Sequence, residues 1–256
     1  MRGFAKGTYG DAFADVYDDW YADVTDVDAT IDRMVSVAGA SSRVLELGVG
    51  TGRLAVPLAL AGPTVVGVDS SQAMLDRLDA RLATFADGST PSGATVTVTT
   101  VCGDMVADLP DGPFDAALVA YNTLFNLLDD GAQQACFHAV AARLVPGGAF
   151  VVEVVVPDET AAAGSDVSVR SMTVDRVVLS VSDHRPAERT TSGQFVEFTE
   201  SGGVRLRPWA IRWSSVAELD AMAQAAGFVV EERLADMAGS TFDDDSTQHV
   251  TIYRLS

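Results

Sequence analysis

The chain has 256 residues, of which 48% are hydrophobic and 7% aromatic, and this is enough apolar material for a sizeable core. Such a composition excludes collagen-like, disulfide-scaffold and disordered chains. The net charge is −19, from 17 Lys and Arg against 36 Asp and Glu. A surface this acidic repels phosphate backbones and anionic lipid, so we expect neither nucleic acid nor a membrane as partner.

The two cysteines, Cys102 and Cys136, are too few for a disulfide framework, and we expect both to be small core residues. No Cys/His cluster has zinc spacing, so no metal site is expected. The N-terminus lacks the apolar stretch of a secretory signal, and the longest apolar run, 149–157, is too short to span a bilayer. We therefore expect a soluble, cytoplasmic monomer or homodimer.

The N-terminal segment has a helical pattern. Five residues fall at i, i+3, i+4, i+7 and i+8 on one face of a helix, namely Phe13, Val16, Tyr17, Trp20 and Tyr21. A second short helix is predicted from about Asp28 to Ala38. We assign residues 1–34 to an N-terminal helical cap.

Strand and helix patterns then alternate along the chain. The predicted strands are 43–47, 64–68, 95–101, 116–120 and 149–155, and the predicted helices between them are 54–61, 71–85 and 133–144. Apolar strands that alternate with helices predict the α/β class, with a parallel sheet covered on both faces.

The pattern changes after Pro157. The segments 167–173, 176–182, 191–200 and 204–213 resemble strands with no helix between them. They predict an antiparallel insertion over 159–213 that could act as a substrate lid. A helix over 215–226 follows, with Ser214 or Ser215 as N-cap and Glu218 completing a capping box, and the last predicted strands are 228–233 and 249–255. The α/β domain therefore comprises 35–158 and 214–256.

A glycine-rich turn links the first strand to the next helix, with Gly48, Gly50 and Gly52 in alternate positions. Glycine lets the backbone approach a ligand closely, and the helix that follows offers free N–H groups. Asp69 ends the second strand, where a carboxylate can accept both hydroxyls of a ribose. Together these residues predict an adenosine-type ligand over the first two strands.

Two cofactor patterns can be compared with this turn. The dinucleotide pattern G-x-G-x-x-G/A fits 50–55 but leaves Gly48 without a role. The pattern E/D-x-G-x-G-x-G fits Glu46 and the three glycines without adjustment. Three further segments follow in the order found in class I S-adenosylmethionine (SAM)-dependent methyltransferases, namely 103–105, 114–119 and 144–148. Over roughly 9–156 and 215–256 the chain resembles this family.

The resemblance implies a Rossmann-like seven-stranded class I methyltransferase sheet with an inserted antiparallel β lid, and SAM as cofactor. It implies that Asp69 holds the ribose and that Asp104 and Met105 meet the adenine. The full set of implied SAM contacts is Tyr17, Glu46, Gly48, Gly50, Gly52, Asp69, Ser70, Met74, Asp104, Met105 and Tyr121.

A narrower resemblance concerns the acceptor. The segments 14–21 and 120–125 and the insertion are similar to bacterial N-methyltransferases that act on nucleotide-linked amino sugars in antibiotic pathways. In those enzymes a tyrosine matching Tyr21 faces the transferred methyl. The resemblance implies methyl transfer to the amino group of a nucleotide-linked deoxyamino sugar. An O-methyltransferase of small natural products, an NAD-type oxidoreductase and a non-catalytic partner protein with this fold stay as alternatives.

The acceptor atom determines which catalytic residues are needed. An amine must only be neutral to attack, whereas a hydroxyl requires a general base. Tyr21, Glu153 in a central strand, and His184 in a predicted turn of the insertion are the catalytic candidates. A paired structural acid and a solvated turn are the competing interpretations of the last two.

The expected substrate contacts, besides Tyr21, are Asn122, Thr123, Arg205 and Arg207. The two arginines alternate on one strand and could grip a diphosphate, or they could be solvated on an edge strand. Arg53 could meet the SAM carboxylate, or lie on a solvated helix face. His138 and His249 are expected to be surface or structural residues.

Overall fold

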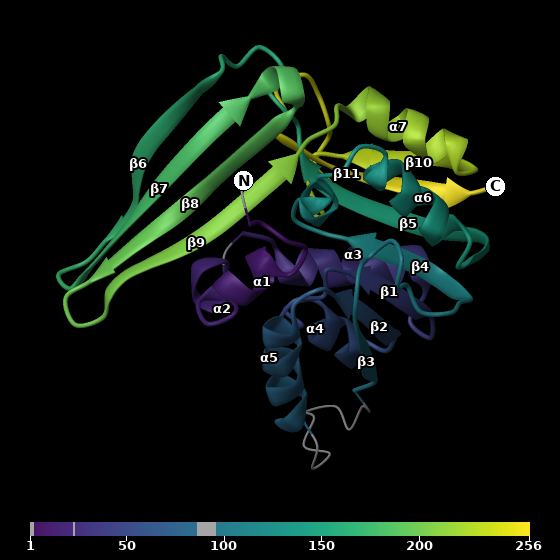
Figure 1. Ribbon diagram of the computed structural model, residues 1–256. Helices are drawn as coiled ribbons and strands as arrows, with labels where there is room; N and C mark the ends of the chain where they lie inside the picture. The colour runs from purple at the N-terminus through teal and green to yellow at the C-terminus, as the bar shows by residue number, and fades with distance from the viewer. Residues whose placement is uncertain (1–2, 23, 86–95) are drawn as a thin grey trace.

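The computed structural model describes residues 3–22, 24–85 and 96–256, and they form two sheets (Figure 1). The larger sheet has the strand order β10-β11-β5-β4-β1-β2-β3. Its strands are β1 (Arg43–Leu47), β2 (Thr64–Asp69), β3 (Val98–Cys102), β4 (Phe114–Val119), β5 (Leu144–Val155), β10 (Phe228–Leu234) and β11 (Gln248–Leu255). Strands β1 to β5 are parallel, and β11 is antiparallel to both of its neighbours. The predicted seven-stranded class is confirmed.

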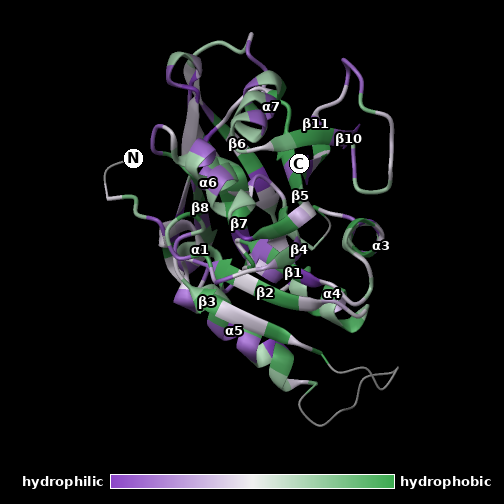
Figure 2. Cartoon of the chain, turned by 90° about the vertical axis from the view of Figure 1, so that its right-hand side faces the viewer, coloured by the Kyte–Doolittle hydropathy of each residue, from purple (hydrophilic) through white to green (hydrophobic). Residues whose placement is uncertain are grey.

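Helices cover both faces of this sheet because its central strands are apolar on both sides (Figure 2). The helices are α3 (Val27–Ala38), α4 (Ala55–Leu60), α5 (Gln72–Ala83), α6 (Ala132–Ala141) and α7 (Val216–Ala225), with a short 3-10 helix η1 (Thr123–Asn126). Helices α3, α4 and α5 share one buried cluster, and α6 and α7 share a second. None of the helices in the described part of the chain is long and apolar enough to cross a membrane.

Most predicted elements agree with the structure to within a few residues. Among the strands, β5 differs most, because it starts at Leu144 and not at the predicted Ala149. The predicted start of the third strand, Thr95, lies outside the described residues. Ser215 caps α7 as predicted, with its side chain accepting from the backbone of Glu218 and the Glu218 side chain accepting in return.

The insertion is a four-stranded antiparallel sheet, as predicted. Its strands follow one another in the order β6 (Gly164–Met172), β7 (Arg176–Arg185), β8 (Thr190–Thr199) and β9 (Gly203–Arg212). His184 does not lie in a turn. It pairs with Thr191 across β7 and β8, and its Nδ1 lies 2.8 Å from the Thr191 Oγ1. The turn is formed instead by a short 3-10 helix η2 (Pro186–Glu188).

The expectation of one continuous helix from Phe13 to Tyr21 is wrong. The segment forms two short helices, α1 (Thr8–Phe13) and α2 (Tyr17–Trp20). In a continuous helix the Ala12 carbonyl would accept from the Val16 N–H. Here that carbonyl accepts from the Arg207 guanidinium, and Val16 donates to Phe13 instead. The side chain of a distant strand therefore ends the first helix.

Arg207 is enclosed by protein, which corrects its expected role in gripping a diphosphate. Its side chain is 1% exposed and pairs with Asp15 at 2.7 Å and Glu197 at 2.8 Å. Burial opposes its charge, yet the two carboxylates hold its pKa above the ordinary value. Arg205 pairs with the same Asp15 at 2.6 Å but is 57% exposed. Both arginines bind the insertion to Asp15 in the turn after α1, and Arg207 also donates to Ala12 within α1.

Replacing Arg207 by methionine should lower the free energy of unfolding by about 3 kcal/mol or more, because removing one partner of a buried ion pair leaves an uncompensated charge. Arg205→Met is the matched control, since it breaks an exposed pair to the same carboxylate and should cost less than about 1 kcal/mol. Urea unfolding of the two variants measures the difference. Equal losses would show that Arg207 contributes no more than a surface pair.

Candidate active site

A cavity of about 430 Å³ opens at the carboxyl ends of β1, β2 and β3, where the strand order reverses between β1 and β4. The predicted residues that line it are Tyr17, Gly48, Gly50, Asp69, Ser70, Met74, Asp104, Met105 and Thr123. The N-terminal residues Phe4, Lys6 and Tyr9 also line it, and the sequence did not identify them. No residue of the insertion is among the lining residues, so its role as a lid stays a prediction.

The glycine turn packs closely against its neighbours. Gly48, Gly50 and Gly52 have φ of 70°, 55° and 75°, a region that L side chains rarely adopt. A Cβ on Gly48 would lie 2.3 Å from the Thr123 side chain, and one on Gly52 would lie 2.8 Å from Leu78. The turn therefore brings backbone, rather than side chains, to the cavity wall.

Asp69 connects this turn to the end of β2. One carboxylate oxygen accepts from Gly50 N and the other from Ser71 N, each at 2.9 Å. Burial raises the pKa of Asp69, and the backbone N–H donors oppose that shift. Because each oxygen has a second lone pair, the carboxylate can also accept from a pair of ligand hydroxyls at the cavity wall.

Asp104 lies at another edge of the cavity and is paired. One of its oxygens accepts from Val106 N at 3.1 Å and Ala107 N at 2.9 Å, and the other lies 2.8 Å from Lys6 Nζ. Burial works against the charge, but Lys6 and the backbone donors hold the pKa of Asp104 below its ordinary value. Lys6 brings the N-terminal segment across this end of the cavity.

Glu46 and Arg53 lie behind the glycine turn, next to the cavity but not on its lining. Burial raises the pKa of Glu46 to about 8, with Arg53 opposing the shift and Asp69 adding to it. Within the described residues, the Glu46 Oε2 has no hydrogen-bond partner, and neither do the buried Nε and Nη1 of Arg53. These atoms and the glycine cradle fit the methionine end of SAM, which carries an ammonium and a carboxylate.

Four tyrosines pack together beside the cavity, and of these Tyr9 and Tyr17 line it, whereas the predicted Tyr21 and Tyr121 lie behind them. Tyr21 is 6% exposed, and its ring centre lies 4.9 Å from that of Tyr17 and 5.8 Å from that of Tyr121. Tyr9 packs beside them, and burial raises the pKa of Tyr9 well above the ordinary value. From the insertion, the Arg170 guanidinium lies 5.3 Å from the Tyr21 ring centre.

The turn after β4 is held by Asn122, an expected substrate contact, and by Glu153, an expected catalytic residue. Tyr121 and Asn122 have φ of 45° and 64°, which is uncommon for residues other than glycine. Tyr121 N donates to the Glu153 carboxylate at 2.9 Å, and the Asn122 side-chain oxygen accepts from Val155 N at 2.7 Å. Burial raises the pKa of Glu153, which is 7% exposed. The contacts of Glu153 and Asn122 therefore position Tyr121 and Thr123.

Known proteins resemble this chain over the fold and the site. A family model described as a methyltransferase domain matches residues 44–148. The cypemycin N-terminal methyltransferase of a Streptomyces species is 30% identical over 215 residues, which cover 82% of this chain and 81% of that protein. The structure of the CcbJ methyltransferase from Streptomyces caelestis superposes with a TM-score of 0.87 at 38% identity and covers 99% of this chain and 100% of that one.

The chain therefore belongs to the SAM-dependent methyltransferases. A SAM-bound amino pentose methyltransferase from Micromonospora echinaspora, involved in calicheamicin biosynthesis, shares the fold with a TM-score of 0.67 at 21% identity, covering 93% of this chain and 92% of that one. SAM is the cofactor. When bound, it supplies an electrophilic methyl group on a sulfonium.

If Asp69 accepts from the ribose hydroxyls, as the resemblance implies, Asp69→Ala should weaken the binding of S-adenosylhomocysteine by about 1.5–3 kcal/mol, because these charge-assisted hydrogen bonds are lost and the Gly50 turn loses its acceptor. Titration calorimetry measures the change. Asp76→Ala, which removes an exposed acid from α5, is the control and should bind as the wild type does. Unchanged affinity in Asp69→Ala would place the ribose elsewhere.

The raised pKa of Glu46 predicts a pH dependence of stability. Between pH 4.5, the ordinary value, and about 8 the folded chain keeps a proton that the unfolded chain releases. This group's contribution is therefore fully present below pH 4.5 and is lost as the pH rises through about 8.

Glu46→Gln carries no titrating carboxyl at this position. Its free energy of unfolding should therefore increase relative to that of the wild type as the pH rises from 4.5 to about 8. Denaturant unfolding of the ligand-free proteins at a series of pH values tests this. The exposed Glu159→Gln should follow the wild type throughout. Parallel curves for Glu46→Gln and wild type would contradict the burial of a neutral Glu46.

Proposed function

We propose that the enzyme transfers the methyl group of SAM to the amino group of a small molecule, with a deoxyamino sugar of secondary metabolism as the leading acceptor class. The observation that carries the proposal is the chemistry of the cavity wall. No histidine lines it, and the carboxylates that do are engaged or at the rim. A hydroxyl acceptor would need a general base, whereas a neutral amine attacks without one.

The three histidines lie away from the cavity. His184 is bonded to Thr191 within the insertion, and the buried Nδ1 of His249 lies 2.9 Å from Thr251. His138 is exposed on α6. Burial lowers the pKa of His249 to about 4, so it is neutral at physiological pH, but it does not reach the wall.

The carboxylates of the wall have other partners. Asp69 holds the glycine turn and Asp104 is paired with Lys6, while Asp129 is exposed at the rim. Glu153, behind the wall, accepts from Tyr121 N. None of these groups is free beside the tyrosines, which supports an amine acceptor over an oxygen acceptor.

The tyrosines explain how the chain could assist the transfer. Methyl transfer is an in-line displacement in which the charge of the sulfonium is dispersed, so a site that excludes water favours it. Tyr17 lines the cavity and packs against Tyr21, which packs against Tyr121, and the faces of aromatic rings attract a cationic group. In this proposal they orient the methyl toward the acceptor, and Tyr21 is the residue closest to catalysis.

The relatives support the amine but leave the molecule that carries it open. One is named an N-terminal methyltransferase and another an amino pentose methyltransferase. The sequence favoured a nucleotide-linked sugar whose diphosphate would be bound by Arg205 and Arg207. Arg207 is not available for that contact, because it is enclosed by Asp15 and Glu197. An amino sugar is therefore the part of the prediction that we retain, with biosynthesis of an antibiotic as its setting.

The proposal predicts that the acidic limb of the pH–rate profile reports the pKa of the acceptor amine and not the pKa of an enzyme group. With saturating SAM, kcat/KM for two amine acceptors of different pKa should rise along limbs displaced by the difference between those pKa values, because only the neutral amine attacks. S-adenosylhomocysteine release measures the rate. Mass spectrometry locates the added methyl group.

The matched control is the same acceptor with its amino group replaced by a hydroxyl, which should yield no methylated product. A limb that stays fixed when the amine is changed would indicate an enzyme base and contradict the proposal. Turnover of the hydroxyl analogue alone would indicate an O-methyltransferase.

A further inference from the structure

Arg170 differs from the other arginines of the insertion in having no acid as its partner. Between residues 159 and 213 every other arginine forms an ion pair with a carboxylate, and these are Arg176, Arg185, Arg189, Arg205, Arg207 and Arg212. Arg170 forms no ion pair with any residue that the structure describes. In a chain that contains 36 acids, this guanidinium is therefore available to an anion from outside the chain.

A β-bulge in β6 directs Arg170 toward the N-terminal helices. The pairing of β6 with β7 shifts by one residue between Val169 and Ser171, so Arg170 is an extra residue with no partner on β7. Such bulges re-aim a side chain and are frequent beside active sites. The guanidinium of Arg170 lies 4.6 Å from the ring centre of Phe195, which packs against α1 and α2. The side chain therefore points to the face of the sheet that covers these helices.

Three aromatic rings hold the guanidinium in place. Besides Phe195, the rings of Trp20 and Tyr21 each have their centre 5.3 Å from it. A planar guanidinium stacks on ring faces without using its N–H groups. Among the described residues only the Trp20 carbonyl accepts from it, at 3.4 Å. Most of its N–H donors are therefore oriented but unused.

Arg170 is close to the cofactor cavity. The ring of Tyr21, which the guanidinium contacts, has its centre 4.9 Å from that of Tyr17, and Tyr17 lines the cavity. Burial raises the pKa of Tyr21 and of Tyr121, and the positive charge of Arg170 opposes both shifts. One small molecule could therefore extend from the cavity to this charge.

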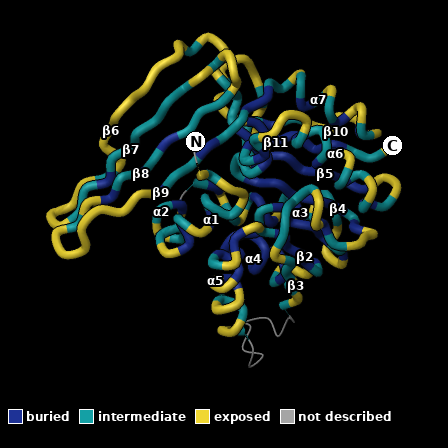
Figure 3. Tube along the Cα trace, in the orientation of Figure 1, coloured by how far each residue is buried: buried dark blue, intermediate teal, exposed yellow. Residues whose placement is uncertain are grey.

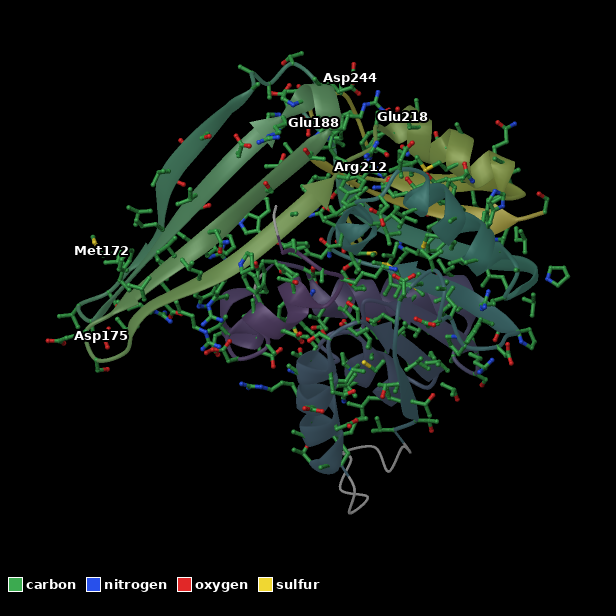
Figure 4. All side chains as sticks on the ribbon, viewed as in Figure 1. Met172, Asp175, Glu188, Arg212, Glu218 and Asp244 are labelled. Atoms are coloured by element: carbon green, nitrogen blue, oxygen red, sulfur yellow. The ribbon has the colours of Figure 1, made fainter. Side chains whose placement is uncertain are left out.

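The approach to Arg170 is open to solvent. The side chain is exposed, as is most of β6, an edge strand of the inserted sheet (Figure 3). Met172, two residues later, lies toward the free tip of the sheet, whereas Arg212 lies where the sheet joins the body (Figure 4). A ligand can therefore reach the guanidinium without displacing the core of the protein.

The surrounding charges favour an anion with a single negative charge. A guanidinium binds one carboxylate through two parallel hydrogen bonds. A diphosphate carries more charge and would need a second cation, but the structure describes all of 159–213 and the other arginines there are paired. The single lysine of the chain, Lys6, is bound to Asp104. The net charge of −19 also repels a multivalent anion more strongly than a monovalent one.

We propose that Arg170 binds a carboxylate group of the acceptor and thereby determines which amines are methylated. The inference rests on the function proposed above, because it places the amine of the acceptor at the methyl group of SAM and the acid at Arg170. The acceptor class is then an amine that also carries a carboxylate, such as the acid form of an amino sugar. Arg170 touches the acceptor but not the reacting atoms, so it acts on binding and specificity.

The test compares two acceptors that differ only in their charge, glucosaminuronic acid and its primary amide. The phosphate ester of glucosamine is the third acceptor and represents the other class of anion. S-adenosylhomocysteine release at saturating SAM gives kcat/KM for each. The wild type should prefer the acid to the amide by about 10- to 100-fold, the range expected for charge-assisted hydrogen bonds.

Arg170→Met should remove this preference, mainly through KM for the acid. Arg170→Lys should retain part of it, because an ammonium keeps the charge but not the planar fork. The matched control is Arg185→Met, which removes an exposed arginine of the same sheet that is paired with Asp183 and should keep the wild-type ratio of acid to amide.

Three results would overturn the inference. The first is a wild type without preference for the acid, and the second is a preference that persists in Arg170→Met. A purely structural Arg170 would give the second result, because its loss would lower kcat/KM for acid and amide alike. The third is a preference for the phosphate ester over the acid.

If none of these sugars is methylated, the proposed amine methylation fails, and binding decides the role of Arg170 separately. Calorimetry on the enzyme loaded with S-adenosylhomocysteine should show the acid binding at least about 10-fold more tightly than the amide to the wild type, and equally to Arg170→Met. The affinity of each variant for S-adenosylhomocysteine shows that it is folded. An acid that does not bind, or that binds the wild type no better than the amide does, would overturn the inference.

Discussion

A buried guanidinium couples the N-terminal helices to the inserted sheet, and the packing of the tyrosines beside the cavity depends on that coupling. The desolvation of Arg207 is offset because its N–H groups donate to Asp15, Glu197 and the Ala12 carbonyl. By taking the Ala12 carbonyl it ends α1 and lets the chain turn before Tyr17. Tyr17 and Tyr21 then pack together, and Tyr21 meets Tyr121, which follows the central strand β4.

The acids around the cavity are in different electrostatic situations. Burial favours the neutral form of Glu46, backbone donors partly compensate the burial of Asp69, and Lys6 keeps Asp104 ionised. A net charge of −19 attracts a cationic cofactor toward the protein as a whole. The dry environment near Glu46 and the tyrosines then favours the step that removes that positive charge. Long-range attraction and local desolvation thus act on the same sulfonium at different distances.

The sequence predicted the cofactor side well because its features are local. Gly48, Gly50 and Gly52 lie within five residues of the chain, and parallel strands bring their carboxyl ends, with Asp69 and Asp104, to a single edge. Lys6 and Tyr9 could not be found in this way, since the N-terminal segment has no periodic pattern. They are held at the cavity by contacts distant in sequence, since Lys6 pairs with Asp104 and its carbonyl accepts from the Ser70 hydroxyl.

The failures on the acceptor side arise from partners distant in sequence. The break after α1 and the enclosure of Arg207 both depend on groups about 190 residues apart, which no local pattern reveals. Glu153 presented a clear signal, a carboxylate inside an apolar strand, but its partner is the Tyr121 N–H across the parallel pair β4 and β5. The sequence therefore identified Glu153 as an unusual residue but could not determine its structural role.

The pairing of Lys6 with Asp104 has a practical consequence. The sequence contains no second lysine, so the single ε-amino group of the chain lies at the mouth of the cofactor cavity, on a side chain that is 65% exposed. Asp104 raises the pKa of Lys6 and keeps this amine protonated, which suppresses its nucleophilicity while the pair is intact. An acylating reagent can therefore modify only one side-chain amine, that of Lys6. The rate of Lys6 acylation reports whether its ion pair with Asp104 is intact.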